Sequence, residues 1–338
     1  MSITIKEVAT EAGVSVSTVS QVLSGNGTVH ISLKTQEKVR RIALDLEYTP
    51  NRFAKSLSEG YANTIGLILP DLKNPFFVHL LDRMESRIIA AGYKVMLDAD
   101  YEHQRQENTK GKLRGWPVDG VIMWALRDES AADAMGAQAT KTPTVYLTGQ
   151  DRAQRDDTIS IDFYTGAQYL VRHLASRGYR RISYVLPYLT MIDDLTFEPR
   201  YLAYKQTMDE LGFPVDTIET HPVGETLEAG WRTGQRIAAL APSQRPEVLF
   251  CHNDVIAIGA YHGLKRGGLS VPEEIAVVGH DGIEAGLYLD KPLTTMTLPL
   301  DEICHHTVEM MFKKLKGGDE PQPEMKISPR FTVGETTR

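Results

Sequence analysis

The sequence predicts a small all-α helix-turn-helix unit followed by a larger α/β body of two doubly wound parallel-sheet lobes. Helix-capping residues and apolar residues at helical spacing occupy residues 1–49. From Thr64 onward, short apolar runs alternate with amphipathic helical stretches, which is the rhythm of βαβ units. The body has roughly 270 residues, which is more than a single hydrophobic core usually serves. We therefore expect two similar lobes.

The helix-turn-helix is predicted by capping residues at close spacing. Thr4 followed by Glu7 has the spacing of a capping box, which places a helix start before Ile5. Gly13 ends that helix, and Ser15 is suited to cap a second one. Because only residues 13–15 separate the two, they form the compact turn that DNA-reading units use.

A third helix completes the small unit. Ser32 is suited to cap it, after the turn-rich residues 24–27. Val39, Ile42, Ala43 and Leu46 then recur at the spacing of one helix face. We expect these residues to supply much of the core of the unit.

The second helix has a polar face that suits a DNA major groove. Its inward positions at helical spacing are Val19, Val22 and Leu23, and its outward positions are Val16, Ser17, Ser20 and Gln21. Glutamine can pair with adenine, serine can bond a base or a phosphate, and valine can contact a thymine methyl. The alternative is an ordinary solvated helix face. The short turn and the third helix favour DNA.

Charge is distributed unevenly along the chain. The 338 residues carry a formal net charge of −7, which by itself disfavours a nucleic-acid partner. Residues 1–60 hold seven Lys and Arg against six Asp and Glu, whereas the remainder holds thirty against thirty-eight. The basic residues of the first segment gather between Lys34 and Arg41 and at Arg52 and Lys55.

Several other classes are disfavoured by missing motifs. We find no secretory leader, no membrane-length apolar run, and no GxSxG, HExxH or phosphate-loop motif, so an enzyme is not expected. Cys251 and Cys304 lie far apart and predict two buried free thiols rather than a disulfide or zinc site. His305 and His306, as neighbours on a helix, should diverge to the surface and the core respectively, without chelating a metal easily. No metal or cofactor is expected.

The residues quoted above resemble the LacI/GalR family of regulators. The stretch TIKEVA at residues 4–9, continued by AGVSVSTVS at residues 12–20, is similar to the family's DNA-binding headpiece. YTPN and AKSL in residues 48–57 are similar to its hinge, and IGLI, PD and NPFF in residues 65–77 to the start of its effector domain. VPEEIAVVGHD at residues 271–281 and PLTT at residues 292–295 match its closing strands, so the resemblance covers nearly the whole chain.

The resemblance implies a DNA interface in two parts. The expected headpiece contacts are Thr4, Ser15, Val16, Ser17, Thr18, Ser20 and Gln21. Asn51, Ala54 and Leu57 match hinge positions that approach DNA, with the leucine wedged between base pairs in the minor groove. The alternative for Leu57 is that it packs a linker onto the body. Many members carry arginine at the position of Gln21, so we expect a different half-site, with adenine in place of guanine.

The resemblance also implies an effector site between the lobes, at the carboxyl ends of the strands. The matching residues are Phe76, Phe77, Trp124, Arg200, Asn253 and Asp281. Aromatic faces with a guanidinium, an amide and a carboxylate suit a sugar-like ligand. The alternatives are that the aromatic residues belong to the core and that Arg200 pairs with Asp281 in an ion pair. His280 and Gly282 depart from the common pattern, so the effector's identity stays open.

The family architecture implies a periplasmic-binding-protein-like body with discontinuous lobes. We expect a headpiece at 1–49, a hinge at 50–60, one lobe at 61–161 and 292–322, and the other at 162–291 and 323–338. A cytoplasmic homodimer on a palindromic operator is expected, because leucine heptads for a tetramer are absent. A free sugar-binding protein, which needs a leader and no headpiece, and an α/β enzyme are the rival interpretations.

Overall fold

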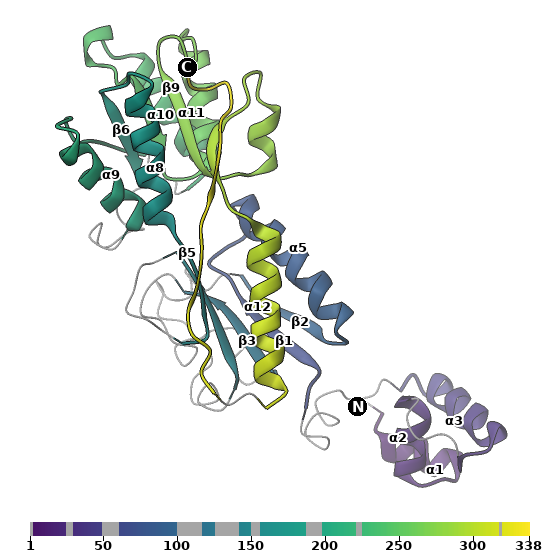
Figure 1. Ribbon diagram of the computed structural model, residues 1–338. Helices are drawn as coiled ribbons and strands as arrows, with labels where there is room; N and C mark the ends of the chain where they lie inside the picture. The colour runs from purple at the N-terminus through teal and green to yellow at the C-terminus, as the bar shows by residue number, and fades with distance from the viewer. Residues whose placement is uncertain are drawn as a thin grey trace. The chain divides into compact units, whose positions relative to one another are not determined.

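The computed structural model describes residues 3–24, 30–48, 61–99, 117–125, 142–149, 156–186, 198–220, 225–317 and 320–338 (Figure 1). The chain divides into two compact units, residues 1–62 and 63–338. Among the helices of these residues, none combines the length and the apolar character that a membrane span requires.

The first unit is a bundle of three helices whose starts were predicted from their caps. The helices are α1 (Ile5–Ala12), α2 (Val16–Ser24) and α3 (Leu33–Asp45). Thr4 and Glu7 form the predicted capping box, and Gly13 ends α1 in the left-handed conformation with φ 65°. The hydroxyls of Ser15 and Ser32 accept hydrogen bonds from the backbone amides three residues later. The three helices are therefore confirmed.

Its core is small and built from all three helices. The fully packed residues are Val8, Ala9, Ala12, Val19, Val22, Val39, Ile42 and Ala43. Leu23 and Leu46 pack against them while remaining partly exposed. The predicted inward faces of the second and third helices are thus confirmed.

The second unit contains two six-stranded sheets. The first sheet has the order β11-β5-β4-β3-β1-β2, and every neighbouring pair is parallel. Its strands are β1 (Thr64–Ile68), β2 (Lys94–Asp98), β3 (Gly120–Trp124), β4 (Thr144–Thr148), β5 (Thr158–Ile161) and β11 (Met325–Ile327).

The second sheet has the order β12-β10-β9-β8-β6-β7, with only β10 and β12 antiparallel. Its strands are β6 (Ile182–Leu186), β7 (Asp216–Glu219), β8 (Val248–Cys251), β9 (Ala276–Asp281), β10 (Thr294–Thr297) and β12 (Arg330–Thr332). Two doubly wound lobes are therefore present, as predicted.

Helices cover each sheet. In the first lobe, α5 (Pro75–Ala90) packs against α12 (Leu300–Leu315) beside the strands (Figure 1). The second lobe carries α8 (Phe163–Ser176), α9 (Pro199–Glu210), α10 (Leu227–Ala238), α11 (Asp254–Arg266) and the short 3₁₀ helices η4 (Pro242–Gln244) and η5 (Glu284–Tyr288). The pair α10 and α11 makes the most extensive contact between any two elements.

The close approach of α10 and α11 depends on glycine. Gly230 and Gly234 on α10 face Gly259 and Gly263 on α11, and a Cβ added at any of the four would lie 2.1–2.4 Å from a backbone carbonyl oxygen of the other helix. Real side chains do not tolerate such distances, so the two backbones touch only because Cβ atoms are missing.

The chain crosses between the lobes at other residues than we expected. It crosses after β5, between β10 and α12, and between β11 and β12. The expected limits of 292–322 and 323–338 are therefore wrong in detail, because β10 still pairs with β9 and β11 pairs with β5. Thr294 is fully buried at the start of β10, where its hydroxyl bonds Thr337 at 2.9 Å. A hydrogen-bonded threonine strand lacks the apolar run that identifies buried strands in a sequence.

Candidate functional site

One face of α2 is open to solvent in the first unit. Its exposed residues are Val16, Ser17, Ser20 and Gln21. Val19 and Val22 are buried on the opposite face, so the helix has the predicted division into a core side and an outer side. Val16 is an apolar side chain on this outer face, and it is 41% exposed.

Three other predicted DNA contacts, Thr4, Ser15 and Thr18, lie at the amino-terminal ends of α1 and α2. Thr4 is the capping residue of α1, and Ser15 caps α2. The hydroxyl of Ser15 also lies 2.9 Å from that of Thr18 and 2.7 Å from that of Ser17. Helix amino-terminal ends with hydroxyl caps can donate backbone amides to phosphate. Asn51, Ala54 and Leu57 lie outside the described residues.

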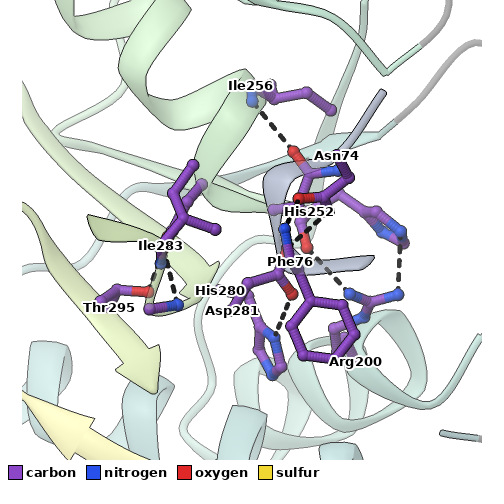
Figure 2. A network of polar contacts seen from close by, with 12 residues as sticks. Asn74, Phe76, Arg200, His252, Ile256, His280, Asp281, Ile283 and Thr295 are labelled. Carbon is purple, nitrogen blue, oxygen red and sulfur yellow. Dashed lines mark hydrogen bonds and ion pairs between the residues drawn. The ribbon is translucent and has the colours of Figure 1, made fainter. Parts of the chain in front are cut away.

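A polar cluster joins the carboxyl ends of strands from both sheets (Figure 2). Asn74 caps α5 after β1, and its Nδ2 donates to Oδ2 of Asp281, the last residue of β9, at 2.8 Å. This hydrogen bond links the first lobe to the second. We use the term polar cluster for Asn74, Glu198, Arg200, Glu225, His252, Asn253, Asp254, His280 and Asp281, the polar side chains connected around this link.

Arg200 is held by residues of its own lobe. Its Nε donates to Glu198 Oε1 at 2.6 Å, and its Nη2 lies 3.3 Å from Oε2 of the same carboxylate. Nη1 donates to the backbone oxygen of His252 at 3.0 Å, and the guanidinium stacks over Phe163 at 4.7 Å. The alternative ion pair with Asp281 is wrong, because the partner is Glu198. Burial opposes the charge of Arg200, but Glu198, together with Tyr184 and Asp281, outweighs burial and raises the pKa above its ordinary value.

Asn253 has two structural partners. Its side-chain oxygen accepts from the Ile256 amide and so caps α11, while Nδ2 donates to Glu225 Oε2 at 2.6 Å. Burial raises the pKa of Glu225 to about 7, although Arg200 opposes the shift. The amide of Asn253 is neutral, and the other close approach to Glu225 among the described residues is that of His252 Nε2, at 3.8 Å.

Asp281 is in an unusual backbone conformation with φ 125°. The neighbouring turn is held by Asp254, whose Oδ2 accepts from the amides of Gly282 at 2.7 Å and Ile283 at 2.8 Å. Its other oxygen accepts from Thr295 at 2.6 Å. Burial raises the pKa of both aspartates, and repulsion adds to it, from Asp281 at Asp254 and from Glu198 at Asp281. Strain of this kind persists only where the surroundings fix it, and it is common at ligand sites.

The two histidines of the polar cluster are neutral. Burial lowers the pKa of His252 well below its ordinary value, and the nearby Arg200 lowers it further. The same two causes lower the pKa of His280, which is fully buried. Arg200 Nη2 lies 2.9 Å from His252 Nε2 and donates to it, which leaves Nδ1 to bond the Tyr184 hydroxyl at 3.1 Å.

The predicted aromatic residues pack on each other beside this cluster. Phe76 and Trp124 are almost fully buried, whereas Phe77 is partly exposed. Phe77 meets Trp124 edge to face at a centroid distance of 5.1 Å, and Phe76 meets it at 5.5 Å. Phe76 follows Asn74 by two residues in the first turn of α5, so the aromatic group adjoins the link to Asp281 (Figure 2).

All six predicted effector residues thus lie at carboxyl ends of strands or in the first turns of the helices that follow. The sequence interpretation did not include Asn74, Glu198, Glu225, His252 or Asp254 as site residues. His252 and Asp254 flank Asn253, and Asn74 precedes the two phenylalanines, so position next to a predicted residue was an available signal. Glu198 likewise lies two residues before Arg200, where it caps α9. Glu225 had no such signal, because it is not next to any predicted residue and only the fold brings it to Asn253.

The remaining predicted groups are structural. Cys251 and Cys304 are free and buried, as expected. We expected His306 to be a core residue. That expectation is wrong, because 32% of its side chain is exposed. His305 and His306 approach Glu309 at 3.2 and 3.8 Å, and ligand atoms of the three residues lie within 4.8 Å of one another, so the expected divergence is also wrong.

Comparison with known proteins defines the class of this molecule. Residues 4–51 match the family described as bacterial regulatory proteins, lacI family, and residues 171–337 match the periplasmic binding protein-like domain. The chain therefore combines a helix-turn-helix unit of the lacI family with a two-lobed body of the periplasmic binding protein-like type. The relatives that match along the whole chain are named as transcriptional regulators.

Individual relatives cover the whole chain. The regulator DegA of Bacillus subtilis is 27% identical over 340 aligned residues, which span 100% of this chain and 98% of DegA. A LacI-family regulator from Silicibacter pomeroyi has a solved structure with a TM-score of 0.80 and 23% identity, covering 99% and 100% of the two chains. The lac repressor dimer bound to operator has a TM-score of 0.74 and 22% identity, covering 100% and 99%.

Proposed function

We propose that this chain is a homodimeric repressor that binds a palindromic operator in the bacterial cytoplasm and is controlled by a small, sugar-like effector bound at the polar cluster. The observation that carries the proposal is the exposed face of α2, which presents Ser17, Ser20 and Gln21 from a separately packed three-helix unit. Two copies of such a unit on a dimer suit two half-sites. The solved lac repressor dimer bound to operator supports this geometry.

The control mechanism follows from the link between the lobes. The hydrogen bond from Asn74 to Asp281 is a contact that a ligand can replace or reinforce, which would change how the lobes meet. A ligand that prefers one arrangement shifts its population, and such coupling is typically worth about 1–3 kcal/mol. A structurally similar regulator, CelR, has been solved in complex with cellobiose, which supports a carbohydrate-like effector.

Operator recognition can be tested with one reading-face variant. Selected palindromic DNA should bind the purified protein with strong salt dependence, and Gln21→Ala should weaken binding by about 1–3 kcal/mol while relaxing preference at one base pair. Fluorescence anisotropy measures both quantities. Gln244→Ala, at an exposed position of η4, is the matched control and should leave affinity unchanged. Equal affinity of the intact protein for selected and scrambled DNA would falsify the regulator proposal.

Effector binding can be tested independently of DNA. In a thermal-shift screen of sugars and nucleosides, a ligand of the polar cluster should raise the melting temperature, because it binds only the folded lobes. The shift should disappear in Asp281→Asn and persist in Asp209→Asn, an exposed aspartate of α9. A shift that survives in Asp281→Asn places the ligand elsewhere.

A further inference from the structure

The charge balance of the polar cluster is uneven. The cluster contains four carboxyl groups, those of Glu198, Glu225, Asp254 and Asp281, and its only cation among the described residues is Arg200. The two histidines add no positive charge, because burial keeps them neutral. Carboxylates taken out of water need compensating charge or several hydrogen bonds.

Arg200 supplies that compensation mainly to one partner. Glu198 takes up its Nε and one Nη2 hydrogen, and His252 takes up further donors, so most of the guanidinium is already used. Glu225 and Asp281 receive neutral amide donors instead, from Asn253 and Asn74 respectively. Burial accordingly raises the pKa of both carboxyl groups even though Arg200 favours their charged forms.

A second feature is an unused acceptor at the same place. His280 is completely buried, and its Nδ1 lies 3.4 Å from Asp281 Oδ1. When the Asp281 carboxyl is ionised it can only accept, so in that state the pairing places the hydrogen on Nδ1 and leaves a lone pair on Nε2. Within the part of the chain that the structure describes, His280 Nε2 has no hydrogen-bond partner. The carboxylates and His280 Nε2 are hydrogen-bond acceptors, so a ligand that pairs with them must supply hydrogen-bond donors.

The aromatic side chains complete the pattern. Phe76, Phe77 and Trp124 form an edge-to-face group, and Phe76 begins the same helix turn that Asn74 caps against Asp281. Aromatic faces attract cations, and they do so more strongly when water is excluded. Carboxylates, a free acceptor and aromatic rings around one place are the elements of an ammonium site.

We infer that the effector held at the polar cluster is a cationic polyol, an amino sugar or amino alcohol whose protonated nitrogen lies among Glu225, Asp281 and His280. This inference rests on the proposed function and narrows its ligand class. Hydroxyl groups of a neutral sugar donate and accept equally and leave the negative charge uncompensated. Sugar phosphates and other anionic ligands are repelled by the same carboxylates.

Matched ligand pairs test the inference on the full-length protein. D-glucosamine is compared with D-glucose and D-glucose 6-phosphate, and Tris with 1,1,1-tris(hydroxymethyl)ethane, which carries a methyl group in place of the ammonium. In thermal-shift and calorimetric titrations, the ammonium member of a pair should bind at least about 10-fold more tightly than its neutral partner. The phosphate should produce no shift.

Variants test whether a preference for the ammonium ligand arises at the polar cluster. Glu225→Gln keeps an acceptor for Asn253 but removes the charge, so it should abolish the preference for the ammonium member. Asp209→Asn should preserve the preference. The inference is overturned if neutral or phosphorylated ligands bind as well as the amines, if no amine binds up to about 50 mM, or if Glu225→Gln keeps the preference. Operator binding, measured separately, shows whether the regulator proposal stands in that case.

Discussion

Gly263→Ala is expected to destabilise the second unit by about 3 kcal/mol or more and to lower its melting temperature by about 6 °C or more. The added Cβ would lie 2.2 Å from the carbonyl oxygen of Trp231 and 3.0 Å from the amide nitrogen of Gln235. Both are backbone atoms, so relief requires α10 and α11 to separate and not merely a side chain to rotate. Thermal melting followed by circular dichroism measures the change.

Gly166→Ala is the matched control for that variant. This glycine also lies in a helix, but its added Cβ would meet only side-chain atoms, those of Pro329 at 3.2 Å and Met296 at 3.3 Å. Alanine is the better helix former by about 1 kcal/mol, which offsets the mild crowding. If both variants have the same melting temperature as the unaltered protein, the close packing of α10 on α11 does not depend on glycine in the way that we describe.

Arg200→Ala is expected to destabilise the protein by about 3–5 kcal/mol and to remove its response to effector. The substitution leaves Glu198 buried without its cation, because the two side chains are only 8% and 11% exposed. Urea unfolding measures the loss. The double substitution Glu198→Gln with Arg200→Met should recover much of the stability, because neither charge then remains buried.

The exposed ion pair between Arg232 and Glu228 on α10 is the matched control for the buried pair. Its side chains are 45% and 55% exposed, so Arg232→Ala should cost no more than about 1 kcal/mol. Losses of equal size for Arg200→Ala and Arg232→Ala would contradict the role of burial. Retention of effector binding by Arg200→Ala would separate a structural role of Arg200 from a ligand-positioning one.

The first unit could be predicted closely because its signals are local. A capping box at Thr4 and Glu7, a left-handed Gly13 and serine caps fix where helices start and stop, and each depends on residues at most a few positions apart. The burial of one α2 face followed directly from helical spacing. Nothing outside residues 3–48 is needed for these features.

The strands were predictable only where they are apolar. The apolar runs that we expect as strands include residues 65–69, 118–123, 182–186, 248–251 and 275–278. β1, β3, β6 and β8 lie within two residues of these ranges, and β9 continues three residues further, to Asp281. The family resemblance placed residues 292–295 in a closing strand, but no apolar run marks β10, because Thr294 is satisfied by hydrogen bonds to Thr336 and Thr337. β7 was missed because it is an exposed edge strand of polar residues. Long-range partners and edge positions are not encoded in local periodicity.

The polar cluster shows the same limit. The resemblance indicated Arg200, Asn253 and Asp281, but it did not reveal which groups pair. Glu198 lies two residues before Arg200 and accepts from its Nε and Nη2, while Asn74 reaches Asp281 across 207 positions of the chain. Hydrogen-bond partners so far apart in the sequence are determined by the topology of the fold. The ligand chemistry of the polar cluster therefore could not be inferred from the sequence alone.

The strand order has a consequence for synthesis of the protein. β11 forms the edge of the first sheet and β12 the edge of the second, and both come from the last segment of the chain, beginning at Met325. A nascent chain on the ribosome therefore carries two open sheet edges until residues 325–332 have been synthesised. Unpaired edges of that kind invite association with other chains, so a message truncated before residue 325 should yield a product that depends on chaperones or aggregates.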